Sequence, residues 1–147
     1  IAQQIRSHGV EVDVCPVKEV TTLDGYSAVI VGSMVRIGKW MPEALKFVET
    51  HRSTLAQKPT ALFTVCMTLA EDNETNRQQV LNEFMAPVRG VVEPRSIGLF
   101  GGVMNLEQHP FLLRFMLQKM NTPRGDFRNW DAIRAWADEI YPVLTQN

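Results

Sequence analysis

Short apolar runs alternate with amphipathic segments along most of this chain. The apolar runs have the length and composition of strands buried in a parallel sheet, and they lie at Ser27–Val31, Thr60–Cys66 and Arg95–Val103. Apolar side chains recur at helical spacing in Pro42–His51, from Asn73 or Thr75 to about Ala86, and in Trp130–Leu144. Because the connections are too long for hairpins, the pattern predicts an α/β fold with crossover helices.

The first fifteen residues predict a helix followed by a strand. Ile1–His8 has a helical pattern, and Gly9 suits the left-handed position just beyond a helix. Val10–Cys15 alternates and is rich in β-branched residues, so it predicts a strand that Pro16 ends. Helices in α/β proteins usually follow a strand and a short loop, so we expect both to precede Ile1 in the complete protein.

The composition is that of one ordinary globular domain spanning residues 1–147. Hydrophobic residues make up 45% of the 147 positions and charged residues 21%, which is enough apolar material for a core. The net charge of −1 gives no electrostatic reason to expect nucleic acid as a partner. No apolar run approaches the roughly 18 residues of a membrane span.

Cysteine and histidine usage favours a cytoplasmic location and gives no sign of a metal site. Cys15 and Cys66 both fall in apolar, strand-like runs and do not form a disulfide framework. His8, His51 and His109 are scattered without the spacing of metal ligands. Neither a nucleophile elbow nor a P-loop occurs in the sequence.

The stretch from Gly32 to Gly38 is the clearest candidate for a ligand-binding loop. It follows the apolar run Ala28–Val31 and precedes Pro42, a residue that suits the first position of a helix. Ligands of open α/β sheets bind in the crevice outside the carboxyl ends of the strands. Glycines at both ends of the stretch also permit close approach of the backbone to a ligand.

The order of several motifs resembles the flavodoxin-like family. The motifs are Asp24-Gly-Tyr-x-Ala-Val-Ile-Val-Gly-Ser, Arg36-x-Gly-Lys-Trp, a helix ending near Phe47-Val48, then Thr60–Cys66, Gly98–Val103 and the apolar Phe111–Met120 before Trp130. Within that family, the chain is most similar to the branch that includes menaquinone-dependent protoporphyrinogen oxidases. The likeness extends over nearly the whole chain.

The resemblance implies a three-layer flavodoxin-like sandwich with a parallel sheet in the order 2-1-3-4-5. It implies FMN at the topological switch point of that sheet. The family's first strand and its phosphate-binding loop would lie before Ile1, and the strand would run between Val10–Cys15 and Ser27–Val31. If the protein began at Ile1, we would expect weak FMN binding at best.

The resemblance also assigns three segments to the flavin ring. The first comprises Ser33, Met34, Val35, Arg36, Ile37, Gly38 and Trp40; the second comprises Thr64, Cys66, Met67 and Thr68; the third is Gly101 and Gly102. Trp40 either stacks on the flavin or packs on the helix that follows it. Arg36 either holds an anionic group of the substrate or the reduced flavin, or is an ordinary surface arginine. Cys66 fits a buried structural cysteine better than a redox thiol.

An insertion at residues 105–129 follows the last predicted strand. Within it, Phe111–Met120 predicts a short helix that is apolar on most of its surface. One interpretation is a satellite core or a contact between two copies of the chain. The other is a lid or an interfacial helix that meets a quinone, a tetrapyrrole or the inner face of a membrane. The oxidase branch carries an insertion at this place, which favours the second interpretation.

Three functions are consistent with the sequence. The first is an FMN-dependent oxidoreductase that resembles menaquinone-dependent protoporphyrinogen oxidase and passes electrons from a reduced substrate to a quinone. The second is a flavodoxin-type electron carrier that serves a redox partner protein without a substrate of its own. The third is a flavin-free interaction module with the same scaffold. Association into a homo-oligomer is compatible with all three.

Overall fold

The computed structural model of the chain describes residues 1–104 and 123–146. Its centre is a four-stranded sheet in the order β2-β1-β3-β4. The strands are β1 (Val29–Arg36), β2 (Lys39–Trp40), β3 (Thr60–Cys66) and β4 (Ser96–Gly101). β1, β3 and β4 run parallel, whereas β2 pairs antiparallel with the end of β1. A separate antiparallel ribbon joins β5 (Val103–Met104) to β6 (Gly125–Asp126).

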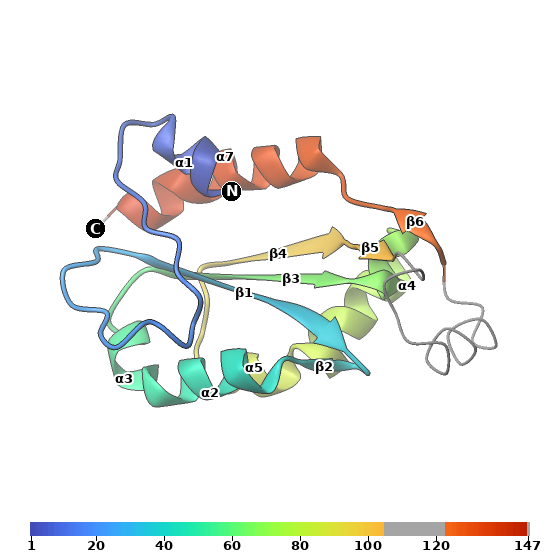
Figure 1. Cartoon of the computed structure of the whole chain (residues 1–147), viewed down its shortest axis with the longest axis horizontal. Helices are drawn as coiled ribbons and strands as arrows, with labels where there is room; N and C mark the ends of the chain where they lie inside the picture. The colour runs from blue at the N-terminus through green and yellow to red at the C-terminus, as the bar shows by residue number, and fades with distance from the viewer. Residues whose placement is uncertain (105–122, 147) are drawn as a thin grey trace.

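Helices cover both faces of the sheet, as Figure 1 shows. One face carries α1 (Ala2–Arg6) and α7 (Trp130–Thr145). The other carries α2 (Pro42–Thr50), α3 (Arg52–Leu55) and α5 (Ala86–Arg89). Between β3 and α5 the chain forms a 3-10 helix η1 (Met67–Ala70), α4 (Glu74–Gln79) and a π-helical turn η2 (Val80–Phe84). The result is a three-layer sandwich, which confirms the predicted α/β fold class.

Strand β3 divides its side chains between two apolar cores because successive side chains point to opposite faces of a strand. Leu62 and Cys66 face the core that the helices α2, α3 and α5 cover. Ala61 belongs to the core beneath α1 and α7, and Phe63 packs against that core. Burial of β3 on both faces explains its nearly continuous apolar sequence.

Several predicted elements are confirmed. The bounds of β3 and the start of α2 agree with the prediction, and Asn73 caps α4 by accepting a 2.9 Å hydrogen bond from the backbone N–H of Asn76. The predicted apolar stripe of α7 is buried, and it comprises Ile133, Trp136, Ala137, Ile140 and Leu144. The helix predicted to run to about Ala86 is instead interrupted, because η2 changes the hydrogen-bond spacing after α4.

The predicted strand at Val10–Cys15 is wrong, since this segment has no regular secondary structure. A strand needs a neighbouring strand to satisfy its backbone groups, and none of the described strands runs alongside it. The segment instead folds back on α1, where Arg6 Nε donates a 3.1 Å hydrogen bond to the carbonyl oxygen of Val12. Cys15 is exposed rather than enclosed by apolar neighbours.

The predicted loop from Gly32 to Gly38 is also wrong in part. β1 continues through Arg36, and Met34 still pairs with Val65 of β3. Only Ile37 and Gly38 form the turn to β2. Within the described residues, the outer edge of β1 before β2 pairs with no strand, and this is where the family resemblance implies the first strand.

Some predictions fall outside the residues that the structure describes. The apolar segment Phe111–Met120 and most of the predicted insertion at 105–129 belong to this group, so the predictions about them stay predictions. Of the insertion, the structure describes β6 and the connection to α7. Among the described helices, none combines the length and the apolar character that crossing a membrane requires.

Candidate functional site

The three predicted contact segments meet at one edge of the sheet. β1, β3 and β4 run in the same direction, so their carboxyl ends lie together. The register places Ser33 beside Thr64 and Cys66 beside Gly101. Segments that are about thirty residues apart in sequence therefore share one surface, which is where ligands bind in open α/β sheets.

Two of the predicted polar contacts, Ser33 and Thr64, are buried and already hydrogen-bonded to the protein. The Thr64 hydroxyl donates to the carbonyl oxygen of Ser33 at 3.2 Å, and Thr64 has no exposed surface. The Ser33 hydroxyl donates to the carbonyl oxygen of Met34 at 2.9 Å and accepts a 3.1 Å hydrogen bond from the N–H of Met41. These hydroxyls join β1 to β3 and to the start of α2, so they shape the edge without facing a ligand.

The end of β1 and the turn after it present the most exposed part of this edge. Met34, Arg36 and Ile37 are exposed. Val35 is half-buried because it packs against the apolar core that α2, α3 and α5 cover. Ile37 has φ of 52° and Gly38 φ of 68°, so both residues of the turn adopt the left-handed region. Of the first segment, these residues are the ones that a ligand can reach.

Trp40 packs on the helix that follows it, in agreement with one of the two interpretations of this residue. Only 5% of its surface is exposed, and it belongs to the same core cluster as Ala44 and Phe47 of α2. Its indole Nε1 is buried and has no hydrogen-bond partner among the described residues. A buried donor without an acceptor is unfavourable by about 1–3 kcal/mol. Stacking of this ring on a flavin would require it to leave the core.

The second segment changes from buried to accessible within three residues. Cys66 is 4% exposed, and burial raises the pKa of its thiol, while hydrogen bonds from Leu69 and Thr68 act in the opposite direction. A thiol with a raised pKa is a poor nucleophile at neutral pH, so Cys66 fits a structural cysteine. Met67 and Thr68 begin the 3-10 helix and are half-buried, so their side chains reach the surface of the edge.

Neighbouring parts of the chain come close to both glycines of the third segment. A Cβ atom on Gly101 would lie 2.5 Å from the carbonyl oxygen of Phe127 and 2.9 Å from that of Leu69. A Cβ atom on Gly102 would lie 3.2 Å from Cγ1 of Val65. Both glycines therefore allow neighbouring chain segments to approach the end of β4. Gly101 is half-buried and retains an accessible backbone, whereas Gly102 is buried.

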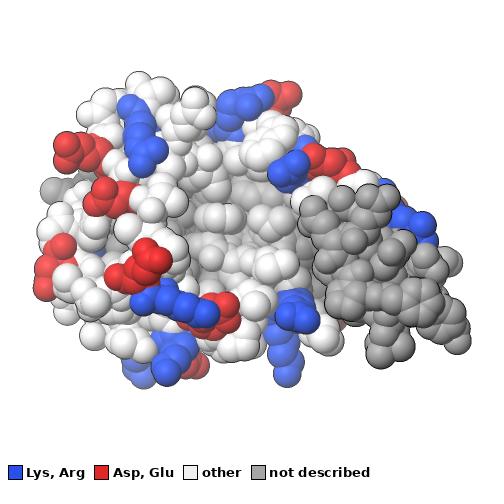
Figure 2. Space-filling model, in the orientation of Figure 1, with Lys and Arg blue, Asp and Glu red and all other residues white. Residues whose placement is uncertain are grey.

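The predicted contacts thus divide into an accessible set and a structural set. The accessible set is Met34, Arg36, Ile37, Gly38, Met67, Thr68 and Gly101, and the structural set is Ser33, Trp40, Thr64, Cys66 and Gly102, with Val35 half-buried toward the core. Most accessible side chains are apolar. Figure 2 shows charged side chains around the margin of the face seen in Figure 1 and an uncharged, hollowed centre.

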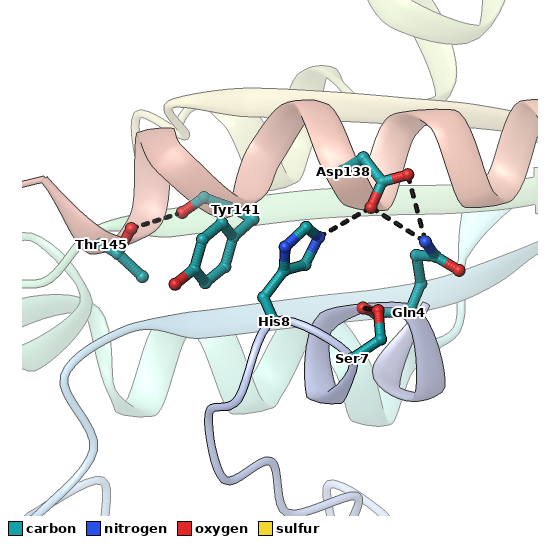
Figure 3. A network of polar contacts seen from close by, with 6 residues as sticks. All are labelled: Gln4, Ser7, His8, Asp138, Tyr141 and Thr145. Carbon is teal, nitrogen blue, oxygen red and sulfur yellow. Dashed lines mark hydrogen bonds and ion pairs between the residues drawn. The ribbon is translucent and has the colours of Figure 1, made fainter.

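The polar network between α1 and α7 was not predicted from the sequence. Gln4 Nε2 donates to both carboxylate oxygens of Asp138, at 3.0 and 3.1 Å, and His8 Nε2 lies 2.8 Å from Oδ1. The His8 ring also stacks on Tyr141 with 4.3 Å between ring centroids (Figure 3). Local sequence patterns do not predict such contacts, because the contacting residues are more than 120 positions apart along the chain. The network fixes α1 to α7 at a distance from the carboxyl edge.

Charged groups near the edge give no sign of a metal centre. In the acidic stretch after η1, Asp72 is exposed and forms a 2.8 Å ion pair with Arg77. Among residues 1–104 and 123–146, no three His, Cys, Asp or Glu side chains come together as metal ligands. The site therefore offers apolar surface, hydroxyl and backbone groups, and the exposed cation Arg36.

A shallow groove lies elsewhere on the molecule. It encloses about 620 Å³ and is lined by residues between η2 and the start of β4, among them Leu81, Arg89, Glu93 and Ile97. Ile97 stands near the amino end of β4, opposite to the edge described above. The groove is thus separate from the candidate site.

The accessible residues fit one wall of a flavin ring. A flavin presents a flat apolar ring with polar groups on one side, and Met34, Ile37 and Met67 supply apolar surface beside the Thr68 hydroxyl. The family resemblance places the phosphate contacts before Ile1, so this fit concerns the ring alone.

Comparison with known proteins supports this interpretation. A relative, protoporphyrinogen IX dehydrogenase (quinone) of Leishmania major, is 24% identical over 154 residues. The alignment covers 95% of this chain and 66% of that protein, so the chain spans just under two thirds of its length. The sequence profile described as flavodoxin domain matches residues 1–131. These findings support a flavin cofactor and flavin-type oxidoreductase chemistry, and the chain belongs to the flavodoxin domain family.

Proposed function

We propose that the protein is an FMN-dependent oxidoreductase that moves electrons from a reduced substrate through the flavin to a quinone. The observation that carries this proposal is the placement of three accessible apolar side chains, Met34, Ile37 and Met67, at or just beyond the carboxyl ends of the paired strands β1 and β3. Membership in the flavodoxin domain family supports a flavin as the ligand of this apolar wall. The similarity to protoporphyrinogen IX dehydrogenase (quinone) supports the reaction class.

The residues of the edge have distinct roles in this proposal. Met34 and Met67 would hold the ring, since their flexible thioether side chains can adapt to its shape. Thr68 and the backbone after Cys66 would supply hydrogen bonds to the polar groups of the ring. Arg36 attracts the anionic groups of the substrate or of the reduced ring. FMN, when bound, supplies the redox chemistry, and the protein supplies binding and orientation.

The buried residues of the edge hold this wall in place. The hydrogen bond from Thr64 to Ser33 joins β1 to β3 next to Met34, and Ser33 binds the N–H of Met41 at the entry to α2. A wall on paired strands is held more rigidly than one on a free loop. The preorganised edge therefore meets the ring at a small cost in conformational entropy.

The relative's name supports our choice of substrate and electron acceptor. Protoporphyrinogen IX is our proposed substrate and a quinone our proposed acceptor. The propionate groups of this tetrapyrrole are anionic, and Arg36 is an exposed cation within the accessible set. The cytoplasmic location predicted from the cysteines belongs to the same proposal.

The test uses the protein expressed from its complete coding sequence and saturated with FMN. Under anaerobic conditions, protoporphyrinogen IX should bleach the visible flavin absorption, and a soluble menaquinone analogue should restore it while fluorescent porphyrin accumulates. Bound FMN that protoporphyrinogen IX does not bleach would contradict the oxidase function and favour the electron carrier. Failure to bind FMN would contradict the flavoprotein function as a whole.

A further inference from the structure

The turn between β1 and β2 holds an isoleucine in a conformation that isoleucine rarely adopts. Arg36 pairs with Lys39, and between them Ile37 and Gly38 both have positive φ values, of 52° and 68°. These are features of a type I′ turn, whose first central position prefers asparagine, aspartate or glycine. A β-branched residue is strained there because its Cβ atom crowds its own backbone.

The strained residue gains little stabilisation from its own side chain. The Ile37 side chain is 92% exposed, and in Figure 1 the turn lies at the right end of β1. A strained conformation persists only where the surrounding structure enforces it. The support for this turn must therefore come from residues that hold Gly38 and the start of β2.

Phe84 supplies part of that support, because its ring lies against the backbone of the turn. A Cβ atom on Gly38 would lie 3.3 Å from Cε1 and 3.6 Å from Cδ1 of Phe84. Phe84 is half-buried and packs against the core that α2, α3 and α5 cover. Trp40, which follows the turn on β2, belongs to that core. The turn is thus held between an aromatic ring and an anchored strand.

A π-helical turn determines where the Phe84 ring lies. At the end of η2, the N–H of Met85 donates a 2.9 Å hydrogen bond to the carbonyl oxygen of Val80, five residues earlier. Val80 and Met85 are both fully buried, although five residues would separate them by about 140° around an α-helix. The wider π-helical turn brings both to one face, and Phe84, just before Met85, then lies beside Gly38.

The helical segment that carries Phe84 also packs on the second contact segment. α4 is in contact with η1, which begins with Met67 and Thr68. The side-chain amide of Asn76 in α4 donates a 2.8 Å hydrogen bond to the carbonyl oxygen of Glu71, just beyond η1. The continuous segment from α4 through η2 therefore links the turn after β1 to the segment after β3.

We propose that Phe84 is a positioning residue for the flavin ring. It holds the turn of Ile37 and Gly38 in its strained form, and so keeps Met34 and Ile37 in the arrangement that receives the ring. The inference rests on the function proposed above, and it assigns Phe84 no contact with the ring. Without the aromatic support the turn would relax, and FMN binding would have to order it again at a cost in affinity.

A purely structural role of Phe84 is the alternative, and Leu81 provides the matched comparison. Leu81 lies in the same π-helical turn, is also half-buried and packs on the same core. It lines the shallow groove that is separate from the candidate site. Loss of apolar volume at Leu81 should therefore destabilise the fold without loosening the turn after β1.

The test compares Phe84→Leu, Phe84→Tyr and Leu81→Ala in the complete protein. Phe84→Leu should weaken FMN binding about fivefold, as measured by quenching of flavin fluorescence. Phe84→Tyr keeps the aromatic ring and should bind FMN within about twofold of the wild type. Leu81→Ala should also bind within about twofold, although its melting temperature falls by about 2–4 °C.

Amide hydrogen exchange measures the turn itself, without flavin. In flavin-free protein, the peptide covering residues 34–40 should exchange at least about tenfold faster in Phe84→Leu than in the wild type, because the turn opens locally. Exchange of the same peptide should be unchanged in Leu81→Ala. This pair of results separates support of the turn from a general contribution to stability.

Three results would overturn the inference. They are equal FMN binding by the wild type and Phe84→Leu, an equal loss of FMN affinity in Phe84→Leu and Leu81→Ala, and unchanged exchange of residues 34–40 in a folded Phe84→Leu variant. The second would assign Phe84 a general stabilising role. A wild type that binds no FMN would instead contradict the proposed function, and the exchange experiment would still decide whether Phe84 holds the turn.

Discussion

The hydroxyl of Thr64 donates a 3.2 Å hydrogen bond to the carbonyl oxygen of Ser33, and this bond joins β3 to β1 at the edge where the candidate flavin wall begins. Both residues were predicted as ligand contacts, and the structure gives their hydroxyls partners within the protein. A polar residue next to a ligand site can thus serve the site by shaping it. The distinction is open to experiment, because a shaping role and a binding role respond differently to substitution.

Replacing Thr64 with valine should therefore affect stability more than flavin affinity. The change removes the buried donor and keeps the shape of the side chain, so unfolding should become easier by about 0.5–1.5 kcal/mol. FMN affinity should change less than about twofold, since the fully buried residue does not face the ligand. Urea unfolding and FMN titration measure the two quantities. A large loss of affinity in a stable Thr64→Val variant would show that the hydroxyl binds the flavin.

A side chain at position 32 should destabilise the fold. A Cβ atom at this position would overlap the ring of Phe63 on the neighbouring strand. We expect Gly32→Ala to destabilise the fold by about 1–3 kcal/mol, because the ring must leave its preferred position.

Gly90 provides a matched control for this substitution. It has a helical φ of −71°, and a Cβ atom there would meet the carbonyl oxygen of Ala86 at an ordinary 3.4 Å. Gly90→Ala should leave the free energy of unfolding unchanged or raise it by about 0.4–1 kcal/mol. Equal effects of Gly32→Ala and Gly90→Ala on unfolding would contradict the role assigned to the Phe63 ring.

The docking of α1 on α7 should weaken in acid. Hydrogen bonds from Gln4, and then from His8, hold the pKa of the Asp138 carboxyl below its usual value. A carboxyl whose pKa is lower in the folded state stabilises that state above its unfolded pKa of about 4. This contribution is lost as the pH falls through the folded pKa.

Melting temperatures of the wild type and of Asp138→Asn measure this effect. Between about pH 5 and pH 3, the melting temperature of the wild type should fall more than that of the variant, because the variant lacks the titrating carboxyl group. Glu139→Gln is the control from the adjacent, exposed position of α7. It should keep the acid sensitivity of the wild type. Parallel curves for the wild type and Asp138→Asn would show that the network does not stabilise the protein.

Arg128 should account for the low pKa of Asp126. Arg128 Nε donates a 2.8 Å hydrogen bond to Oδ1 of Asp126, and this contact lowers the pKa of the carboxyl to about 2. In Arg128→Ala, an NMR titration should return the midpoint toward 3.8, the ordinary value. Arg134→Ala, which removes an arginine from α7, should leave it near 2. An unchanged midpoint in Arg128→Ala would assign the shift to another group. Because the pKa is lowered, any stabilisation by this pair is present above the unfolded pKa and lost in acid.

Local sequence patterns predict the helices and strands of this fold well where the residues that form an element also determine its structure. Thr60–Cys66 is apolar throughout because β3 is covered on both faces, and Asn73 carries its own capping side chain. The segment Val10–Cys15 has a strand-like sequence but forms no strand, since β structure depends on a neighbour that local sequence does not show. The extension of β1 past Gly32 depends in the same way on pairing with β3.

The candidate site was predictable in its location and only partly in its chemistry. The carboxyl ends of parallel strands meet at one edge by geometry, so three separate segments could be placed together. Whether a side chain at that edge faces ligand or core depends on packing, and Thr64 and Trp40 both face inward. The unusual conformation of Ile37 has no signal in the sequence, because its turn lacks the asparagine or aspartate that normally precedes glycine.

Titration of the complete protein with FMN, followed by flavin fluorescence, tests the central claim most directly. It should compare the wild type with Met34→Glu and with the control Val14→Glu, both at exposed positions. Met34→Glu places a negative charge on the proposed ring wall, so FMN should bind at least about tenfold more weakly while the melting temperature changes little. Val14→Glu should bind as the wild type does. Saturable binding with this difference between the variants supports a flavin at the edge of β1 and β3, whereas equal FMN binding by all three proteins, or by none, would contradict it.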